Sequence, residues 1–201
     1  EEPLDLNLVF SGHGKHLDCP TLQLANHHGL MIAGEAALSN WDAGMDMYIY
    51  GKLGNLIMTK EGINVLMTNL TGKVPPILQR LDYIRFNGEA AGYLHDLTLT
   101  GLFYTGAGMV KTDVMMSIDE QSMSRTYSGS VASADLDLGK LLNQEKKFGK
   151  VDFNVELKGF NYKNRYPESY IKGIISSFEY SQYQYENIML DGVYKDGGFN
   201  G

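Results

Sequence analysis

The chain has 201 residues, of which 43% are hydrophobic and 20% are charged, and these proportions exclude wholesale disorder. Seventeen basic residues against 24 acidic ones give a net charge of −7, which argues against a nucleic-acid partner, because such proteins normally present a basic face. Glycine supplies 23 residues and proline only 5, so the chain is rich in turns but is neither collagen-like nor a proline-rich linker.

The sequence shows no targeting signal. Its first residues, Glu1 and Glu2, are acidic and lack the layout of a signal peptide, and no window approaches the ~18 apolar residues of a membrane helix. The single cysteine, Cys19, cannot form an internal disulfide. Because the chain opens within an alternating run and stops at Gly201 inside a motif seen earlier, we expect residues 1–201 to be a single β-rich domain excised from a longer protein.

Apolar and polar residues alternate in several runs, which are 4–10, 45–50, 63–67, 110–119 and 151–158. A period of two predicts strands with one apolar and one polar face, and a sheet that is wet on one side is typically antiparallel. These runs recur every ~8–14 residues with Gly, Asn or Asp between them, which is all-β spacing.

Helical signals are few, and we predict two short helices. One lies within residues 74–81, where two prolines precede apolar residues and proline is tolerated in a first helical turn. The other follows Asp137, which can cap a turn in which Leu138, Leu141 and Leu142 share a face. Both are too short to be stable without packing against the sheet.

An internal repeat places glycine at the same point of two strands. Residues 97–106 and 188–197 share an apolar–polar alternation, then Gly101 or Gly192, then an aromatic residue and a turn that ends in glycine. Glycine within a strand marks a bulge, a bend or a close backbone approach. Further glycines within or at the ends of strands are Gly88 and Gly159. The fold class that follows is all-β, a long curled antiparallel sheet, taco-like or a half-barrel, with two short helices.

A group near the N-terminus has residue types that bind zinc. It consists of His13, His16, Cys19, His27 and His28. The spacing of three superficially resembles a zinc half-site. However, Gly12, Gly14 and Pro20 predict a loop that joins two strands, and no second pair follows. We therefore predict a solvated turn and no metal site.

Enzymatic signals are close to absent. Asp135 and Asp137 would share one strand face, but no calcium loop accompanies them and Asp137 fits a helix cap better. The chain has no nucleophile elbow, phosphate loop or dinucleotide fingerprint, and Cys19 has no recognisable catalytic partner. We therefore expect a non-enzymatic protein without a cofactor.

Aromatic residues gather near the C-terminus, at Phe178, Tyr180, Tyr183 and Tyr185. Exposed tyrosines can stack on sugar rings, which would suit a glycan-binding surface. Tyrosine is also common on the wet side of strands without any such role. The sequence favours the second interpretation and leaves the first open.

The second half of the chain resembles the AsmA/TamB superfamily of large envelope proteins, in the form found in Bacteroidetes. The motifs that carry the resemblance are DLGKLL at 137–142, GKVDFNVELKG at 149–159 and IKGIISSFEYSQYQYENIMLDGVY at 171–194. Residues 75–92 resemble the family's short helix followed by a strand with paired glycines. The match covers residues 70–201, and the earlier part agrees only in general character.

The resemblance implies a long curled sheet with an apolar inner face, in a periplasmic protein that a helix outside this fragment anchors in the inner membrane. Such proteins are associated with the movement of phospholipid between membranes and with the assembly of outer-membrane proteins. The first hypothesis is therefore an apolar groove for phospholipid or another acyl-chain ligand. Its candidate residues are Val151, Phe153, Val155, Leu157, Leu97, Leu99, Ile188 and Leu190.

Alternative hypotheses belong to other functional classes. One is a scaffold or chaperone whose sheet edges receive strands of outer-membrane β-barrel proteins by β-augmentation. Another is a glycan-binding β-sandwich that uses Tyr180, Tyr183 and Tyr185. In a sandwich the candidate groove residues would form an ordinary core.

Overall fold

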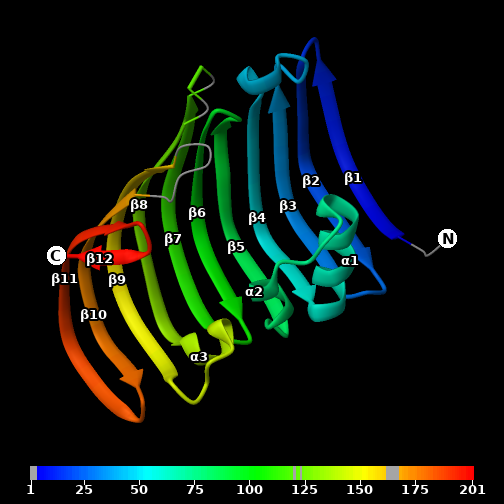
Figure 1. The fold of residues 1–201 in the computed structure, drawn as a ribbon. Helices are drawn as coiled ribbons and strands as arrows, with labels where there is room; N and C mark the ends of the chain where they lie inside the picture. The colour runs from blue at the N-terminus through cyan, green and yellow to red at the C-terminus, as the bar shows by residue number, and fades with distance from the viewer. Residues whose placement is uncertain (1–3, 120, 123, 162–167) are drawn as a thin grey trace.

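A computed structural model describes residues 4–119, 121–122, 124–161 and 168–201. The strands of this part form one antiparallel sheet of twelve, and their order in the sheet is their order in the chain (Figure 1). The strands are β1 (Leu4–His13), β2 (His16–Asn26), β3 (Leu30–Ser39), β4 (Tyr48–Thr59), β5 (Tyr83–Tyr93), β6 (Asp96–Thr105), β7 (Gly108–Asp119), β8 (Ser124–Asp137), β9 (Phe148–Asn161), β10 (Glu168–Tyr180), β11 (Tyr183–Lys195) and β12 (Gly198–Asn200).

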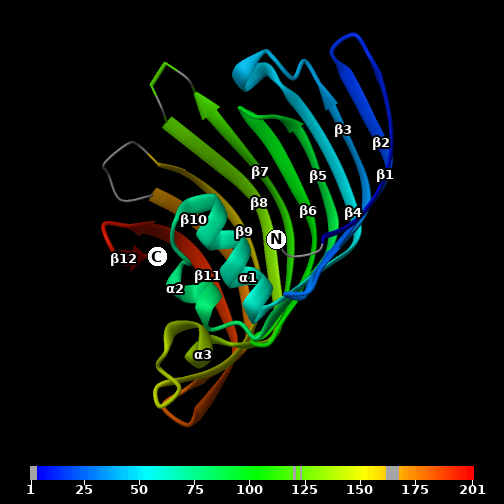
Figure 2. The same ribbon diagram turned by 90° about the vertical axis from the view of Figure 1, so that its right-hand side faces the viewer.

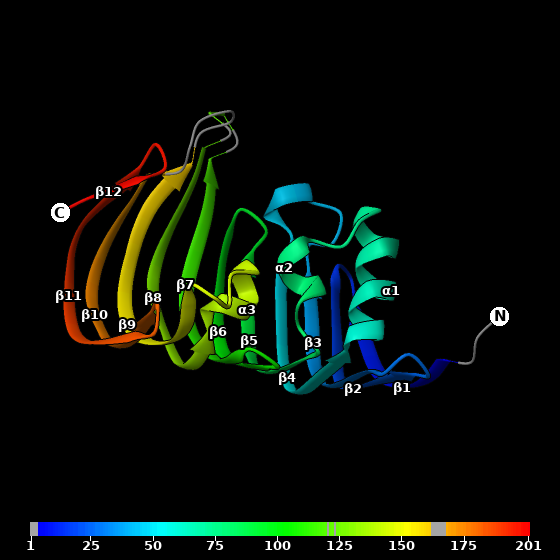
Figure 3. The same ribbon diagram turned by 60° about the horizontal axis from the view of Figure 1, so that its bottom comes forward.

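The predicted fold class is confirmed. β1 and β12 lie at opposite edges of the sheet, so the sheet is not closed into a barrel. Figures 2 and 3 show that the sheet curls, and that the helices lie on its concave side near one end of the strands. Because the described strands all belong to one sheet, the sandwich considered as an alternative is not formed.

The two predicted helices are present as α2 (Pro76–Gln79) and α3 (Leu138–Leu142). The side chain of Asp137 accepts a hydrogen bond from the backbone N–H of Lys140, as predicted for a cap. Within the described residues, no helix combines the length and the hydrophobicity needed to cross a bilayer.

A third helix, α1 (Lys60–Thr71), corrects the prediction of a strand at residues 63–67. The Thr59 side chain accepts a hydrogen bond from the N–H of Gly62 and caps the helix, which ends at Gly72 in the left-handed conformation. Ile63 and Met67 lie one turn apart and both pack into the small core. Apolar residues at 63, 65 and 67 fit a strand, but the pair at i and i+4 also fits a helix, and the cap and the final glycine decide between them.

The predicted strand at residues 45–50 begins later than expected. Residues Gly44–Asp46 form a short 3-10 turn, and the N–H of Met47 donates to the carbonyl of Gly44. β4 therefore starts at Tyr48, and Met45 lies outside the sheet. The alternation of Met45, Met47 and Ile49 predicted the start of the strand wrongly, because Met45 lies in the turn and Met47 directly follows it.

The enclosed core is small and lies beneath the helices. Its buried members are Ile63, Leu81, Ile84 and Ala107, and the half-buried residues packed against them include Met58, Met67, Val74, Leu78, Phe103 and Leu141. These residues come from α1, from the segments around α2 and α3, from strands β4 to β6 and from the β6–β7 turn. The helices therefore cover one end of the concave face.

Glycines permit close backbone approach on the concave side. A Cβ at Gly129 of β8 would lie 2.1 Å from the carbonyl oxygen of Asp113 and 2.6 Å from Cα of Val114, and the residue has a φ of +143°. In β6, a Cβ at Gly101 would lie 2.5 Å from a ring carbon of Phe86. A side chain at either position would push neighbouring strands apart.

We expect Gly129→Ala to lower the free energy of unfolding by about 1–3 kcal/mol, the usual cost of a strained backbone conformation. Gly51→Ala is the matched control, because Gly51 lies in β4 on the same face and a Cβ there would have no atom within 4 Å. Urea denaturation of both variants measures the difference. Equal stability of the two variants would contradict the role given to Gly129.

Candidate functional site

The pairing register shows which side chains share the concave face, because directly paired residues of neighbouring strands point to the same side. Ile84 and Phe103 belong to the core beneath the helices, so the residues in register with them lie on the concave side. One row crosses strands β1 to β11 without a break. In order it contains Leu6, Leu24, Ile32, Leu56, Phe86, Phe103, Val110, Ser133, Phe153, Ile175 and Ile188.

The next rows on the same face are less bulky. The adjacent row contains Leu8, Leu22, Gly34, Leu53, Gly88, Gly101, Thr112, Val131, Val155, Gly173 and Leu190. The row beyond it runs from β3 to β11 through Ala36, Gly51, Ala90, Leu99, Val114, Gly129, Leu157, Ile171 and Gly192. None of these rows contains a charged residue.

The candidate residues from the sequence all lie on this one face. Phe153 and Ile188 belong to the first row, Val155 and Leu190 to the second, and Leu99 and Leu157 to the third. Leu97 follows in the next row, where it pairs with Met116, and Val151 pairs with Leu136 towards the end that carries the helices. The structure brings these residues together into one apolar surface, which we call the concave face.

The concave face is shielded but not sealed. Val151 and Val155 are 5% and 8% exposed, whereas the other candidate residues are half-buried. At its margins Leu6 is 53% and Met116 is 41% exposed. The curl brings neighbouring side chains together and shields them in part, so some apolar area still faces solvent.

The apolar residues that β1 to β5 contribute to this face were not among the candidate residues predicted from the sequence. Leu24, Ile32, Leu56 and Phe86 continue the row of Phe153 with the same apolar character. Alternation within each strand was the available signal, but their alignment into one row depends on the pairing register.

Polar contacts fix the helices over one end of the face. Arg80 donates a hydrogen bond to the carbonyl of Leu141 in α3. Lys140 donates to a carboxylate oxygen of Asp82 at 2.6 Å and to the carbonyl of Gly106 at 3.0 Å. The hydrogen bond and charge of Lys140 lower the pKa of the Asp82 carboxyl. α3 is therefore tied to the start of β5 and to the β6–β7 turn.

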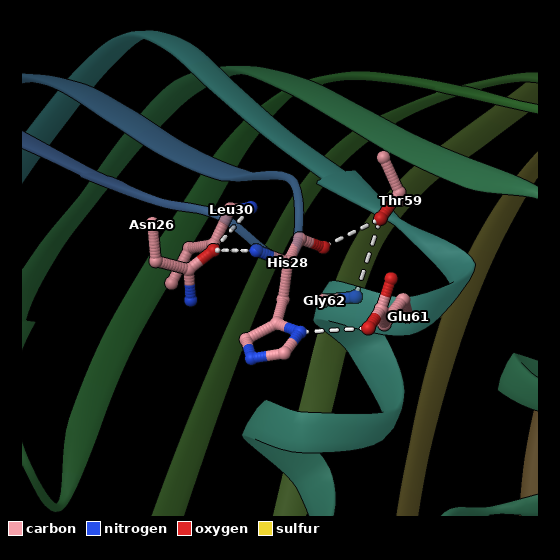
Figure 4. Close-up of polar contacts among 6 residues, drawn as sticks. All are labelled: Asn26, His28, Leu30, Thr59, Glu61 and Gly62. Carbon is pink, nitrogen blue, oxygen red and sulfur yellow. Dashed lines mark hydrogen bonds and ion pairs between the residues drawn. The ribbon is translucent and has the colours of Figure 1, made fainter. Parts of the chain in front are cut away.

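The start of α1 is held by the turn between β2 and β3 (Figure 4). Nδ1 of His28 lies 2.7 Å from a carboxylate oxygen of Glu61, and the Thr59 hydroxyl donates to the carbonyl of His28 at 2.8 Å. The side chain of Asn26 accepts hydrogen bonds from the N–H groups of His28 and Leu30 and shapes that turn. These contacts give His28 and Glu61 a structural role.

The residues considered as zinc ligands are spread along β2 and the turns at its two ends. His13 and His16 flank the β1–β2 turn, whereas His27 and His28 lie in the β2–β3 turn. The expected loop is only a two-residue turn, and Cys19 lies within β2. In the described ranges, no group of three or more His, Cys, Asp or Glu residues could hold a metal ion.

The two carboxylates near α3 have separate partners. Asp135 forms an ion pair with Lys150 at 2.9 Å, whereas Asp137 accepts from the N–H of Lys140 at 2.8 Å. Asp135 has a φ of +52° next to a register shift in β8. The regular alternation that would place Asp135 and Asp137 on one strand face is therefore broken there. The two carboxylates therefore do not act as a pair.

The opposite, convex face carries charged residues together with exposed apolar side chains such as Met115 and Met189. A hollow of about 390 Å³ lies there over β7 to β10, with Met115, Ser128, Lys158, Glu168 and Tyr170 among its walls. The hydroxyl of Tyr170 donates to Asp191 at 2.7 Å, and this hydrogen bond raises the pKa of the phenol. The walls of this hollow are mostly apolar, but Lys158 and Glu168 lie among them, whereas the concave rows have no charged member.

Comparisons of the chain with protein-family models, with curated proteins and with solved structures gave no match.

We expect Asp82→Asn to speed hydrogen exchange at the N–H groups of Asn143 and Gln144, which donate to carbonyls of α3. Because the folded-state pKa of Asp82 is lowered, its ion pair is present above the ordinary aspartate pKa of about 3.9 and is lost as the pH falls through the lowered value. Variant and wild type should therefore exchange differently at neutral pH and alike in strong acid.

Asp119→Asn is the control for this experiment. The pKa of Asp119 is also lowered, but by hydrogen bonds from Ser122 in the segment between β7 and β8. It should leave exchange in α3 unchanged. If Asp82→Asn does not alter exchange at neutral pH, the ion pair does not hold α3 in place.

Proposed function

We propose that the chain is a periplasmic segment of an AsmA/TamB-like envelope protein, which holds phospholipid acyl chains against its concave face and carries them between the inner and outer membranes. The observation that carries this proposal is the uncharged row, apolar except for Ser133, that runs from Leu6 to Ile188 across an open sheet. The resemblance of residues 70–201 to that superfamily supplies the cellular context.

The energetics of a one-sided sheet support this proposal. An apolar sheet face must be buried by curling, by a second layer or by a ligand. Here the curl leaves most of the face half-buried and the helices cover one end of it. An acyl chain of ~16 carbons gains up to ~13 kcal/mol when it leaves water, at ~0.8 kcal/mol per methylene.

The same estimate explains why such a surface suits transport. A lipid in a bilayer already has most of this burial, so transfer to the concave face changes its free energy little. A lipid can then both enter and leave. The head group stays at the wet margin of the concave face, so the transfer requires no catalytic residue and no cofactor.

Two adjacent methionines of β7 provide the test. Met116 lies on the concave face and is 41% exposed, whereas Met115 lies on the convex face and is 45% exposed. We expect Met116→Asp to lower the phospholipid bound per chain several-fold, because a carboxylate next to acyl chains must be desolvated. Met115→Asp should bind as wild type does. Native mass spectrometry after incubation with phosphatidylethanolamine and phosphatidylglycerol vesicles measures the bound lipid.

Circular dichroism should show both variants folded, because both positions are well exposed. Val155 is a poorer site for this test, because at 8% exposure a charge there would unfold the sheet. Equal lipid loads for the two methionine variants would count against the proposal, and so would a wild-type chain that takes up no phospholipid.

The edge strand β1 favours a second candidate function, in which the chain receives strands of outer-membrane β-barrel proteins. Among the described strands β1 pairs with β2 alone, and its residues Leu6, Val9 and Phe10 are 53%, 53% and 67% exposed. The strand contains no lysine or proline, which are the residues that commonly protect an edge from further pairing.

Photocrosslinking separates the two candidates. With a photoreactive residue in place of Met116 we expect lipid adducts. With the same residue in place of Val9 we expect no adduct to a β-barrel protein. Strong adducts to barrel proteins at Val9 and no lipid adducts at Met116 would favour the scaffold instead.

A further inference from the structure

The concave face ends in an aromatic cluster, which we define as Phe148, Phe178, Tyr180 and Tyr185. These residues come from the start of β9, the end of β10 and the start of β11. Phe178 pairs with Val151, which places it on the concave side. Its ring centroid lies 6.3 Å from that of Phe148, 6.0 Å from that of Tyr180 and 6.4 Å from that of Tyr185.

The chain already places a cation against this cluster. The ammonium of Lys147 lies 5.3 Å from the ring centroid of Phe148 and 5.7 Å from that of Tyr180. A cation within ~6 Å of an aromatic face is attracted by the ring quadrupole. Lys147 is an exposed side chain on a flexible stem, so a ligand can displace it at modest cost.

The cluster is amphipathic, as the end of a lipid site should be. Tyr185 is 46% exposed and the neighbouring Tyr183 is 71% exposed, whereas Val151 next to Phe178 is 5% exposed. The surface therefore passes from buried aliphatic residues to wet aromatic ones within a few residues of β9 to β11. Tyrosine rings are common at positions that are apolar at one end and hydrated at the other.

We propose that the aromatic cluster binds the ammonium head group of a phospholipid, of the ethanolamine or choline type, whose acyl chains lie along the concave face. This inference rests on the proposed function and names the class of lipid. The head-group ammonium takes the place of the Lys147 ammonium on the rings of Phe148 and Tyr180. A lipid with an uncharged glycerol head group gains nothing from these rings.

Lysolipids with the same 16-carbon chain and different head groups test the inference on the full chain. Titrations with lysophosphatidylethanolamine, lysophosphatidylcholine and lysophosphatidylglycerol below their micellar concentrations, followed by tyrosine fluorescence, give three dissociation constants. We expect the two ammonium lipids to bind about 3- to 20-fold more tightly than the glycerol lipid, which is the range of a cation–π contact.

Two variants assign the preference to the cluster. Tyr180→Leu keeps an apolar side chain but removes a ring, so the preference should disappear while the glycerol lipid binds as before. Lys147→Gln removes the competing cation and should strengthen the binding of both ammonium lipids. Tyr104→Leu is the control, because Tyr104 is 40% exposed on the convex face and its loss should change no dissociation constant.

The outcomes separate this inference from the proposed function. If all three lysolipids bind equally, the head-group site is wrong and the acyl-chain proposal stands. If none of them binds, both are wrong. Phosphocholine without an acyl chain should bind far more weakly than lysophosphatidylcholine, and equal affinity would overturn the assignment to a lipid in favour of a free ammonium compound.

Discussion

Side chains and backbones crowd together on the inner side of the curl, and this crowding limits which residues the sheet can hold there. When a sheet bends, the side chains on its concave face converge and neighbouring backbones come close. The row with Gly34, Gly88, Gly101 and Gly173 leaves space where large side chains would collide. At Gly173 a Cβ would lie 2.2 Å from the carbonyl oxygen of Asn154 on the next strand.

The same crowding explains how an apolar face can be shielded from water without a second sheet packed against it. Large side chains occupy the adjacent first row, where the tilted rings of Phe86 and Phe103 lie with their centroids 4.5 Å apart. Convergence shields the concave side chains from water in part, as the exposures of 5% for Phe86 and 8% for Val155 show. Local curvature therefore replaces part of the burial that a packed layer normally provides, and the short helices need to cover only one end.

Much of this architecture was predictable from the sequence, because a period of two encodes the face of each strand directly. Residues 151–158 show this well, since Val151 and Val155 are buried and Asn154 and Glu156 are exposed. The location of α3 was also predictable, because Asp137 carries a local capping signal that does not depend on distant residues.

The remaining features depend on contacts that a single strand does not encode. Strict alternation would place Leu53 and Leu56 on opposite faces, but a register shift between β4 and β5 pairs Leu53 with Gly88 and Leu56 with Phe86, so both are concave. α1 was missed for a similar reason. Its apolar spacing fits two periods, and the contact of His28 with Glu61 joins residues 33 positions apart.

Charged residues lie at the ends of the concave face and not within its three long rows. At one end Lys147 lies over aromatic rings, and at the opposite end the exposed Arg125 pairs with Ile118 on the same side of the sheet. On the convex side, by contrast, ion pairs such as that of Lys172 with Asp191 are open to water. An amphipathic ligand on the concave face can therefore bury its chain across the rows and leave its charge in water at either end. The rings of the aromatic cluster lie at the Lys147 end, so they, and not charge alone, favour one orientation of the ligand.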